Sequence, residues 1–457
     1  MTQSSHSMAD ADRQYVLHPF TNLSAHQNSG PFIITRGEGI YVWDDQGNKL
    51  IEGMSGLWCT SLGFSEKRLV DAATRQLEIL PFSHMFTHRA TEPAIELSER
   101  LVKIAPEGIG RAFLVNSGSE AVDTALKMAW FYNNALGRTK KKKFISRKRA
   151  YHGVTIAAGS VTALPYVQDG FDLPVVDTLH CETPHFYRYG KDGETEEEFS
   201  SRLADELEQQ ILEADPDTVA AFIAEPVMGA GGAITPPVGY FEKVQKVLKK
   251  YDILFIADEV ICGFGRTGNM FGCQTYDIKP DLMTCAKQLS SAYLPIGAVL
   301  VATHVYDAFV KHSDKLGMFG TGNTYGGHPV AAAVAVETLK IYEEEDTVGH
   351  VRKVSVPFLQ RLKQLDEHPL VGNTRGVGLI AGVELVKDKA SKEQYPVADK
   401  VAAQVMAKAR EHGLIVRAVP GDTVAICPPL IITEEQINDL FDRLTAALDD
   451  VQQTLTA

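Results

Sequence analysis

The chain has 457 residues, of which 44% are hydrophobic and 23% are charged, a composition typical of a soluble globular protein large enough for more than one domain. Its formal net charge of -13 argues against nucleic acid or an anionic membrane surface as the main partner.

The N-terminus and the cysteines bear on location. Residues 2–13 are polar and lack the apolar core of a signal peptide, and no apolar run reaches membrane-spanning length. The six cysteines are scattered without C-x-x-C spacing, which indicates reduced thiols and argues against a disulfide frame or a zinc site. The sequence therefore predicts a cytoplasmic protein with no membrane segment and no metal ion.

The N-terminal part begins with a polar arm that extends to about residue 30. Residues 32–51 then alternate around turn sequences, which predicts a small antiparallel meander. A glycine-rich segment at 53–63 is too irregular for a helix, and its Leu57 and Trp58 are expected to line either a core or a pocket. The next patterns are a helix at 66–80, an aromatic stretch at 82–86 that ends in Phe86, and a helix at 92–105.

A strand, a turn of small residues and a helix follow one another from residue 112. Residues 112–116 indicate a short buried strand, Ser117-Gly118-Ser119 a turn, and 120–132 a strong helix. The free N–H groups and the dipole at such a helix start can hold a phosphate, and the two serine hydroxyls add donors. An ordinary serine-capped helix explains this pattern about equally well when it is taken alone.

Two charged runs are interpreted as solvated surface. The basic cluster at 138–149 is expected to be a solvated helix end, because a nucleic-acid patch is a poor alternative in so acidic a chain. The acidic stretch at 194–208 is expected to be the solvated face of a helix.

Several strands end in polar side chains. A strand at 144–146 leads to a turn with Tyr151 and His152, and two further buried strands end in Glu225 and Asp258. The alternation of strands with helices predicts a mostly parallel α/β sheet, whose ligands sit at the carboxyl ends of the strands. Asn116, Glu225 and Asp258 are therefore expected to converge there. A glycine-rich loop that contains Ala230 follows Glu225.

One glycine motif has a misleading resemblance to a dinucleotide site. Gly263-Phe-Gly265-Arg-Thr-Gly268 fits G-x-G-x-x-G after a strand. Residues 269–273 do not open a helix, so a pyrophosphate would lack its helix N-terminus. We therefore predict a glycine-rich loop and reject a nicotinamide site.

An apolar run at 282–286 carries Lys287 into the expected interior, where desolvation favours a neutral, nucleophilic amine. On this stretch alone, a lysine that reaches solvent from a strand end is the stronger explanation. A long helix is predicted at 330–344. The remaining patterns predict a second, smaller α/β domain, completed by the N-terminal meander, with helices at 352–365, 398–412 and from 434, and strands at 376–385, 413–417 and 424–430.

Together these features meet the requirements of pyridoxal 5'-phosphate (PLP). A lysine forms a Schiff base with the cofactor aldehyde, and a carboxylate keeps the pyridine nitrogen protonated so that the ring accepts electrons. A helix N-terminus receives the phosphate, and an aromatic residue stacks on the ring. When these features are taken together, a functional, buried Lys287 becomes the stronger explanation than a lysine that reaches solvent.

The motifs Asn116-Ser-Gly-Ser-Glu120, Tyr151-His-Gly153, Ala257-Asp-Glu-Val260 with 263–268, and 286–291 resemble those of one family. The chain is similar, over nearly its whole length, to the class III (omega) aminotransferases among the fold-type I PLP enzymes. Relatives that use ornithine, acetylornithine or 4-aminobutyrate commonly show Phe-His-Gly-Arg-Thr at the turn where this chain has Tyr151-His-Gly-Val154-Thr155. This difference favours the amine:pyruvate or beta-alanine:pyruvate branch.

The resemblance implies a large domain with a mostly parallel sheet of the seven-stranded type and a smaller α/β domain formed by both termini. The expected divisions are 1–66 (arm and part of the small domain), 67–328 (PLP-binding domain) and 329–457 (C-terminal small domain). It also implies catalytic roles for Lys287, the Schiff-base lysine and proton carrier, and Asp258, which pairs with the pyridine nitrogen. The further cofactor residues are Ser117, Gly118, Ser119, Tyr151, His152, Glu225, Val260 and, from a partner subunit, Thr321. The implied substrate residues are Leu57, Trp58, Phe86, Tyr151, Ala230 and a mobile Arg417 that binds a carboxylate.

The implied activity is a ping-pong transfer of an amino group from a small-molecule amine to pyruvate or another 2-oxo acid. A homodimer or homotetramer with its active site at the subunit interface is expected. A PLP-dependent aminomutase or racemase and a catalytically silent PLP-binding protein remain the alternatives. The amine is left open among polyamines, beta-alanine, taurine and aryl-alkyl amines, as are the preferred keto acid, dimer or tetramer, and the stereopreference.

Overall fold

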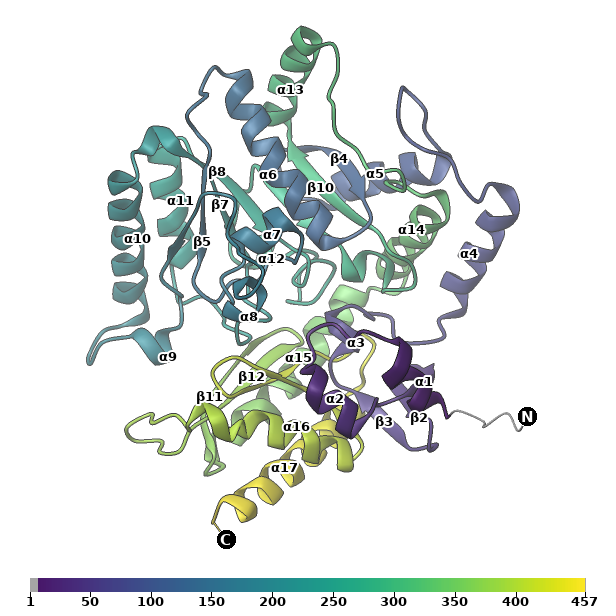
Figure 1. The fold of residues 1–457 in the computed structure, drawn as a ribbon, viewed down its shortest axis with the longest axis vertical. Helices are drawn as coiled ribbons and strands as arrows, with labels where there is room; N and C mark the ends of the chain where they lie inside the picture. Colours follow the sequence, from purple (N-terminus) through teal and green to yellow (C-terminus); the bar gives the residue numbers. More distant parts are fainter. Residues whose placement is uncertain (1–6, 457) are drawn as a thin grey trace.

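The computed structural model describes residues 7–456, and three β-sheets organise them (Figure 1). The largest sheet has seven strands in the order β4-β10-β9-β8-β7-β5-β6. Strand β10 runs antiparallel to both of its neighbours, and the other pairs are parallel, so the predicted mostly parallel sheet is confirmed. The strands are β4 (Ile109–Val115), β5 (Lys143–Arg147), β6 (Thr178–Cys181), β7 (Val219–Ala224), β8 (Leu254–Asp258), β9 (Leu282–Cys285) and β10 (Gly297–Ala302).

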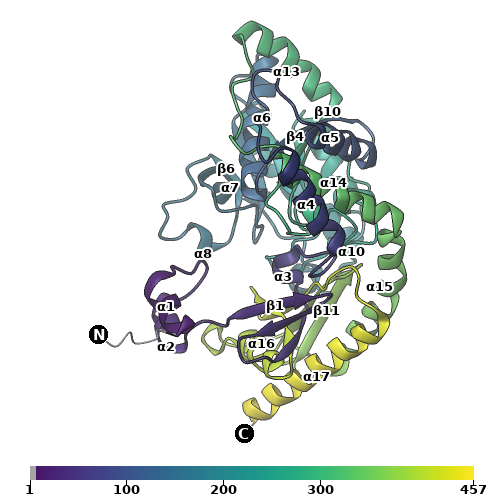
Figure 2. The same ribbon diagram turned by 90° about the vertical axis from the view of Figure 1, so that its right-hand side faces the viewer.

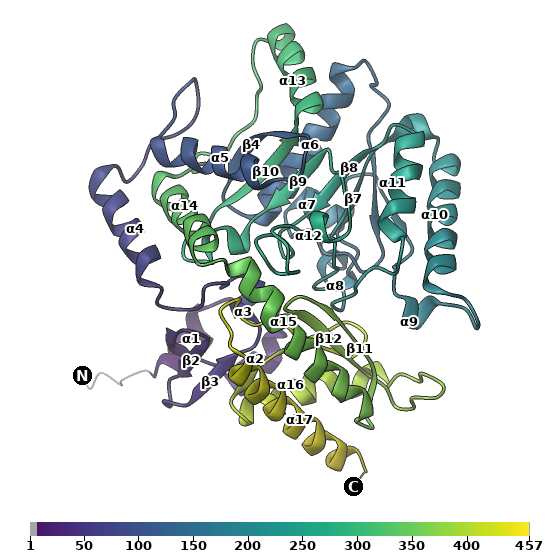
Figure 3. The ribbon, with the colours of Figure 1, turned by 180° about the vertical axis from the view of Figure 1, so that it is seen from behind.

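Helices cover this sheet because its central strands are apolar along their whole length. Every residue of β7, β8, β9 and β10 is buried, as expected for strands packed on both faces. Helix α6 crosses the face turned to the viewer in Figure 1, and α5 and α14 lie on the face seen in Figure 3. The helices of this half are α4 (Lys67–Ile79), α5 (Glu92–Ile104), α6 (Gly118–Ala135), α7 (Ile156–Val161), α8 (Pro165–Gln168), α9 (Phe186–Tyr189), α10 (Glu196–Glu213), α11 (Tyr240–Lys250), α12 (Gly272–Thr275), α13 (Thr303–Leu316) and α14 (Pro329–Glu344).

The two ends of the chain build the other half together. The parallel pairing of β13 with β3 joins the N-terminal meander to the C-terminal segment, as predicted. Figure 2 shows the meander beside the C-terminal helix. The sheets are β1 (Ile34–Glu38), β2 (Tyr41–Asp44), β3 (Lys49–Glu52) with β13 (Leu414–Ile415), and β11 (Val371–Val377), β12 (Ile380–Leu385), β15 (Thr423–Ile426) with β14 (Arg417–Val419). Their helices are α15 (Thr347–Gln364), α16 (Val401–Glu411) and α17 (Glu434–Thr456).

The domain divisions at residues 66 and 328 stay predictions. Helix α14, which follows the second division, packs against α4 and α5 of the large half. Within residues 7–456, no helix is long and apolar enough to cross a membrane.

Three local features go beyond the expectations or differ from them. The polar arm, for which no secondary structure was predicted, contains α1 (Met8–Tyr15) and α2 (Leu23–Ser29), which are capped by the side chains of Ser7 and Asn22. The glycine-rich segment contains a single kinked turn, α3 (Ser55–Trp58). The basic cluster is not solvated throughout, because Lys141 is buried and its Nζ donates to the backbone carbonyls of Asp252 and Tyr251 at 3.0 and 3.1 Å, among others.

Candidate active site

A cavity of about 370 Å³ lies at the edge of the seven-stranded sheet where β4, β7, β8 and β9 end. These four strands run in the same direction, so the residues that follow them meet at one edge. The predicted convergence of Asn116, Glu225 and Asp258 is therefore found. The cavity brings together ten of the candidate residues, namely Leu57, Ser117, Gly118, Ser119, Tyr151, His152, Glu225, Asp258, Val260 and Lys287.

Lys287 enters the cavity directly after β9. The apolar strand ends at Cys285, and Lys287 begins a turn with a φ of +47°, a conformation that is costly for a residue with a side chain. Burial lowers the pKa of the Lys287 ammonium, and the nearby charge of Asp258 offsets part of this effect. The lysine is thus placed to supply a neutral amine more readily than a surface lysine.

Asp258 ends β8 as a buried carboxylate that faces the cavity. Its Oδ1 accepts hydrogen bonds from the backbone N–H of Val260 at 3.1 Å and from the Thr284 hydroxyl at 3.0 Å. Its Oδ2 lies 2.7 Å from His152 Nδ1, while His152 Nε2 is buried and has no hydrogen-bond partner among the described residues. A buried carboxylate with neutral donors and one imidazole can receive a cationic group, as a protonated pyridine ring would be.

The start of helix α6 forms the opposite end of the cavity. Ser117 caps the helix by accepting from Glu120 N at 3.2 Å, and Ser119 Oγ accepts from Val154 N at 3.1 Å. A Cβ atom at Gly118 would lie 3.1 Å from the Val260 side chain, which would have to shift by a few tenths of an ångström. The first N–H groups of this helix and its dipole suit an anion, and the cradle therefore fits a phosphate. The serine cap and a phosphate site are therefore compatible at this helix start.

Glu225 connects the end of β7 to the turn that carries Tyr151. Its carboxylate accepts from the backbone N–H of Tyr151 at 3.2 Å and of Gly229 at 2.9 Å. Burial raises the pKa of Glu225, and the neighbouring His152 opposes that rise. The Tyr151 side chain packs against a small buried cluster that includes Ala230, so Ala230 lies behind Tyr151 and does not line the cavity. With the lysine, the carboxylate and the phosphate cradle, these residues fit PLP.

Arg417 borders a second, larger cavity of about 1200 Å³. Its walls are mostly apolar and include Phe20, Ile156 and Tyr166. The Arg417 side chain is half-buried, and no hydrogen bond or salt bridge holds its guanidinium within residues 7–456. Its charge acts on both Tyr151 of the first cavity and Tyr166 of the second, where it partly opposes the rise in the tyrosine pKa that burial causes.

Besides Ala230, three more candidate residues lie outside both cavities. Trp58 is only 2% exposed and packs in a core cluster with Met54 and Ile261, whereas its neighbour Leu57 lines the first cavity. Phe86 is exposed, and the Thr321 hydroxyl is 2.6 Å from Lys127 Nζ. Their implied roles with substrate and with a partner's phosphate site stay predictions.

Arg266 was missed as a structural residue of the site, although its motif was noted. Arg266 lies in the loop at 263–268, and its side chain is fully buried. Its guanidinium donates to Gln288 Oε1 at 3.1 Å and Ser55 Oγ at 3.2 Å, and so connects the residue after Lys287 to the segment before Leu57. The glycine motif thus places a structural arginine, Arg266, and does not form a dinucleotide site. Tyr166 was also missed, because no motif surrounds it.

Comparisons with known proteins agree on a single family. The family model Aminotransferase class-III matches residues 23–448. The protein named Gamma aminobutyrate transaminase 3, chloroplastic, from Solanum lycopersicum is 50% identical over 438 residues, or 96% of this chain and 84% of that protein. A thermostable omega transaminase 6-fold mutant from Pseudomonas jessenii is 53% identical with a TM-score of 0.97, covering 99% of this chain and 100% of that one. The Pseudomonas jessenii omega transaminase in complex with PMP is also 53% identical, with a TM-score of 0.96 over 98% of each chain.

Proposed function

This chain belongs to the class III aminotransferases, and on that premise we propose that it transfers an amino group from a primary amine or an omega-amino acid to pyruvate. The products are an aldehyde or ketone and alanine. The fold is that of a PLP-dependent fold-type I enzyme, and the family is one of aminotransferases. We propose the amine donor and the acceptor pyruvate, whereas the aminotransferase family follows from the family model.

The residues around the smaller cavity divide the work of holding the cofactor. Lys287 is the attachment point, Asp258 pairs with the pyridine nitrogen, and the N-terminus of α6 with Ser117 and Ser119 holds the phosphate. His152 fixes the Asp258 carboxylate through the bond at its Nδ1. When bound, the cofactor supplies an electron sink for the carbanion that remains after a substrate carbon loses its proton.

Lys287 Nζ moves the proton in both halves of the reaction. The lowered pKa of Lys287 favours the neutral amine, which can accept a proton from the substrate carbon and later donate it. Thr284 and Val260 N hold Asp258 in place while this proton moves. Both substrates are proposed to react in turn at the site of Lys287, so the first product must leave this site before the second substrate binds.

The unpaired guanidinium of Arg417 is the observation that carries the substrate assignment. A guanidinium binds a carboxylate through two parallel hydrogen bonds, which suits pyruvate and the far end of an omega-amino acid. The apolar walls of the larger cavity suit amines without a carboxylate, provided that the long Arg417 side chain turns away. The names of the relatives include both gamma-aminobutyrate transaminases and omega transaminases, and both kinds of donor fit this arrangement.

A homodimer or homotetramer is part of the proposal. Phe86 is exposed, and Gly322 lies against it, so both Phe86 and the neighbouring Thr321 are available to complete a partner's site. Cytoplasmic location stays a prediction, because relatives are named as chloroplastic and mitochondrial.

The test follows the visible absorption band of the bound cofactor. Excess 1-phenylethylamine or 4-aminobutyrate should remove the band of the purified protein, and pyruvate should restore it with one alanine formed per site. Lys287→Ala should lose steady-state turnover by roughly 10⁴-fold or more. The control is Lys67→Ala, whose lysine is 82% exposed and should leave turnover unchanged.

Each other outcome rejects a defined part of the proposal. A band that amines remove but pyruvate never restores excludes pyruvate as the acceptor. Turnover of an amine without any keto acid indicates an aminomutase or racemase. A band that never moves indicates a silent PLP-binding protein, and near wild-type turnover of Lys287→Ala excludes the assigned lysine.

A further inference from the structure

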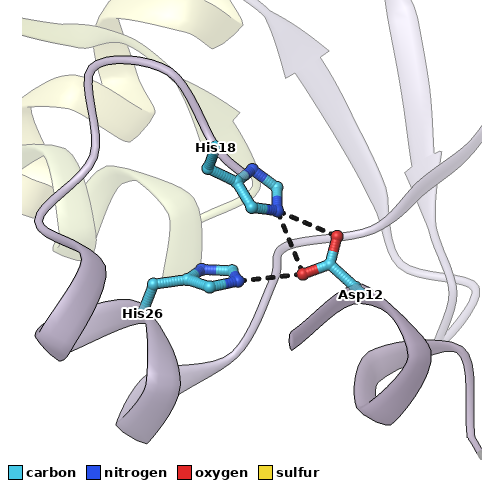
Figure 4. A group of neighbouring side chains, drawn as sticks. All are labelled: Asp12, His18 and His26. Atoms are coloured by element: carbon cyan, nitrogen blue, oxygen red, sulfur yellow. Dashed lines mark hydrogen bonds and ion pairs between the residues drawn. The ribbon is translucent and has the colours of Figure 1, made fainter. Parts of the chain in front are cut away.

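The N-terminal arm contains a cluster of metal-ligating side chains that the transamination does not use. Asp12 lies in α1, His26 in α2, and His18 in the segment between the two helices. Both imidazoles point their Nε2 atoms at one carboxylate (Figure 4). The His18 Nε2 atom lies 3.0 and 2.9 Å from the two Asp12 oxygens, and His26 Nε2 lies 2.9 Å from Oδ1.

The distances among these atoms are close to those of a metal site. One ligand atom from each residue lies within 4.8 Å of the other two. Zinc bonds to imidazole nitrogen and carboxylate oxygen of about 2.0–2.1 Å in tetrahedral geometry place ligand atoms about 3.3 Å apart. A spread of a few tenths of an ångström would admit the ion, with a water molecule in the fourth position.

The charges of the cluster also favour a cation. The two imidazole rings stand 4.2 Å apart, and His26 is buried. In the tautomers that carry the proton on Nδ1, the two neutral imidazoles and the carboxylate have a net charge of minus one, and each directs a lone pair towards a common point.

Within residues 7–30 the arm buries little apolar surface that could hold it in place. Helix α1 buries none of its residues, and α2 buries only His26. Small elements without a hydrophobic core are commonly stabilised by a disulfide or a metal ion, and the arm contains no cysteine. We propose that Asp12, His18 and His26 bind a divalent transition-metal ion of the Zn²⁺ type.

The bound ion would act on a wall of the larger cavity. The three ligands close a short loop whose residues Leu17, Pro19 and Phe20 line that cavity together with Arg417. The Phe20 ring meets Tyr166 edge-on, with centroids 6.1 Å apart. Fixing the loop therefore fixes one side of the space that substrates occupy under the proposed function, although metal binding itself does not depend on that function.

Metal binding is tested on untagged holoenzyme dialysed against EDTA and then titrated with Zn²⁺ in a calorimeter. We expect one ion per chain with a Kd in the micromolar range or tighter, retained through gel filtration. Residues around metal ligands already contribute roughly 10- to 100-fold in affinity, so loss of a ligand in Asp12→Asn, His18→Gln or His26→Gln should cost at least roughly 100-fold. The control is His412→Gln, which removes one imidazole from a His–Asp pair of 2.9 Å and should bind Zn²⁺ like the wild type.

Limited trypsin digestion tests whether the ion fixes the arm. Arg13 is the only lysine or arginine before Arg36 in the chain, so cleavage after it reports on α1. Zn²⁺ should slow this cleavage about tenfold in the wild type and in His412→Gln, and not in His26→Gln.

Either of two results would overturn the metal site: a Zn²⁺ affinity that is only millimolar, or an affinity that is the same in the wild type and in all three ligand variants. Tight binding without protection at Arg13 keeps the site but removes its effect on the arm. Equal melting temperatures of the variants in EDTA would show that each of them folds.

Discussion

Two buried carboxylates, Glu384 and Asp258, each contact an imidazole, but they differ in their other hydrogen-bond donors. Glu384 in β12 accepts from Arg375 Nη1 at 2.6 Å, from His185 Nε2 at 2.8 Å and from Arg188. Asp258 in β8 is buried to a similar degree, but one imidazole and two neutral groups are its only hydrogen-bond donors within residues 7–456. The Asp258 carboxylate lines the smaller cavity, whereas Glu384 does not, although its partners His185 and Arg375 border a separate groove of about 650 Å³.

The difference separates a structural ion cluster from a binding site. Burial lowers the pKa of His185 to about 4, so its ring is neutral at pH 7 and donates a hydrogen bond. Burial alone would raise the pKa of Glu384, but His185, Arg375 and Arg188 together hold it well below its usual range. The Glu384 carboxylate thus already has two guanidinium partners. At Asp258 a buried negative charge still lacks a cation, and a protonated pyridine ring would supply it.

Replacing Asp258 should affect chemistry far more than folding. Asp258→Asn keeps the size of the side chain and removes the charge that keeps the ring protonated. We expect kcat to fall roughly 10³-fold, as when a preorganised electrostatic group is removed. Stopped-flow absorbance of the donor half-reaction and the melting temperature of the apoenzyme should be measured together. If Asp258→Asn destabilised the apoenzyme as strongly as Glu384→Gln, Asp258 would also be a structural carboxylate and the comparison would fail.

Replacing Glu384 should have the converse effect. Glu384→Gln leaves the Arg375 and Arg188 guanidinium groups buried without their anion, which should cost about 3–5 kcal/mol of unfolding free energy. Urea unfolding of the apoenzyme measures this loss. The folded fraction should keep the wild-type kcat, because no atom of this cluster lines the smaller cavity. A large loss of kcat in fully folded protein would contradict the structural role.

The sequence was sufficient for those parts of the site that depend on local pattern. Apolar runs that end abruptly in Glu225, Asp258 and Lys287 mark strand ends, and parallel strands bring such ends to one edge. The turn of small residues before α6 was likewise visible, because a Ser cap and a following helix are both local features.

The rest of the site depends on contacts between distant segments. His152 and Asp258 are 106 residues apart, and nothing in either segment specifies that they meet. Glu384 and its cationic partners carry no motif at all. Lys141 was expected in solvent, but four carbonyl groups from separate loops surround its ammonium, and a single sequence does not reveal such acceptors.

The pH dependence of stability should distinguish the two regions further. Burial raises the pKa of Glu259, beside Asp258, to about 7, so its stabilising effect is full below about pH 4.5 and is lost as pH rises through 7. Glu384 has a lowered pKa, so its contribution is present above about pH 4.5 and is lost on acidification.

Glu259→Gln should therefore remove a decline in apoenzyme stability of up to roughly 3 kcal/mol between pH 4.5 and 7. Glu384→Gln should instead remove a decline below pH 4.5. Melting curves of both variants at matched ionic strength measure these slopes. Identical pH profiles for the wild type and Glu259→Gln would show that Glu259 ionises as an ordinary carboxyl group.

Arg417 and Arg375 extend the comparison to cations. Arg375 is held by Glu384 and by Gly232 O at 2.6 Å, whereas Arg417 has no hydrogen-bond or salt-bridge partner within residues 7–456. Hydrogen bonds to a charged group contribute about 1.5–3 kcal/mol, so Arg417→Ala should raise the KM of pyruvate and of 4-aminobutyrate about 10- to 100-fold. The single-turnover rate with 1-phenylethylamine, which has no carboxylate, should stay the same. Arg417→Lys keeps the positive charge but lacks the planar guanidinium. Its KM values for pyruvate and 4-aminobutyrate should lie between those of the wild type and of Arg417→Ala. Equal losses for both donors would mean that Arg417 shapes the cavity wall and does not select the carboxylate.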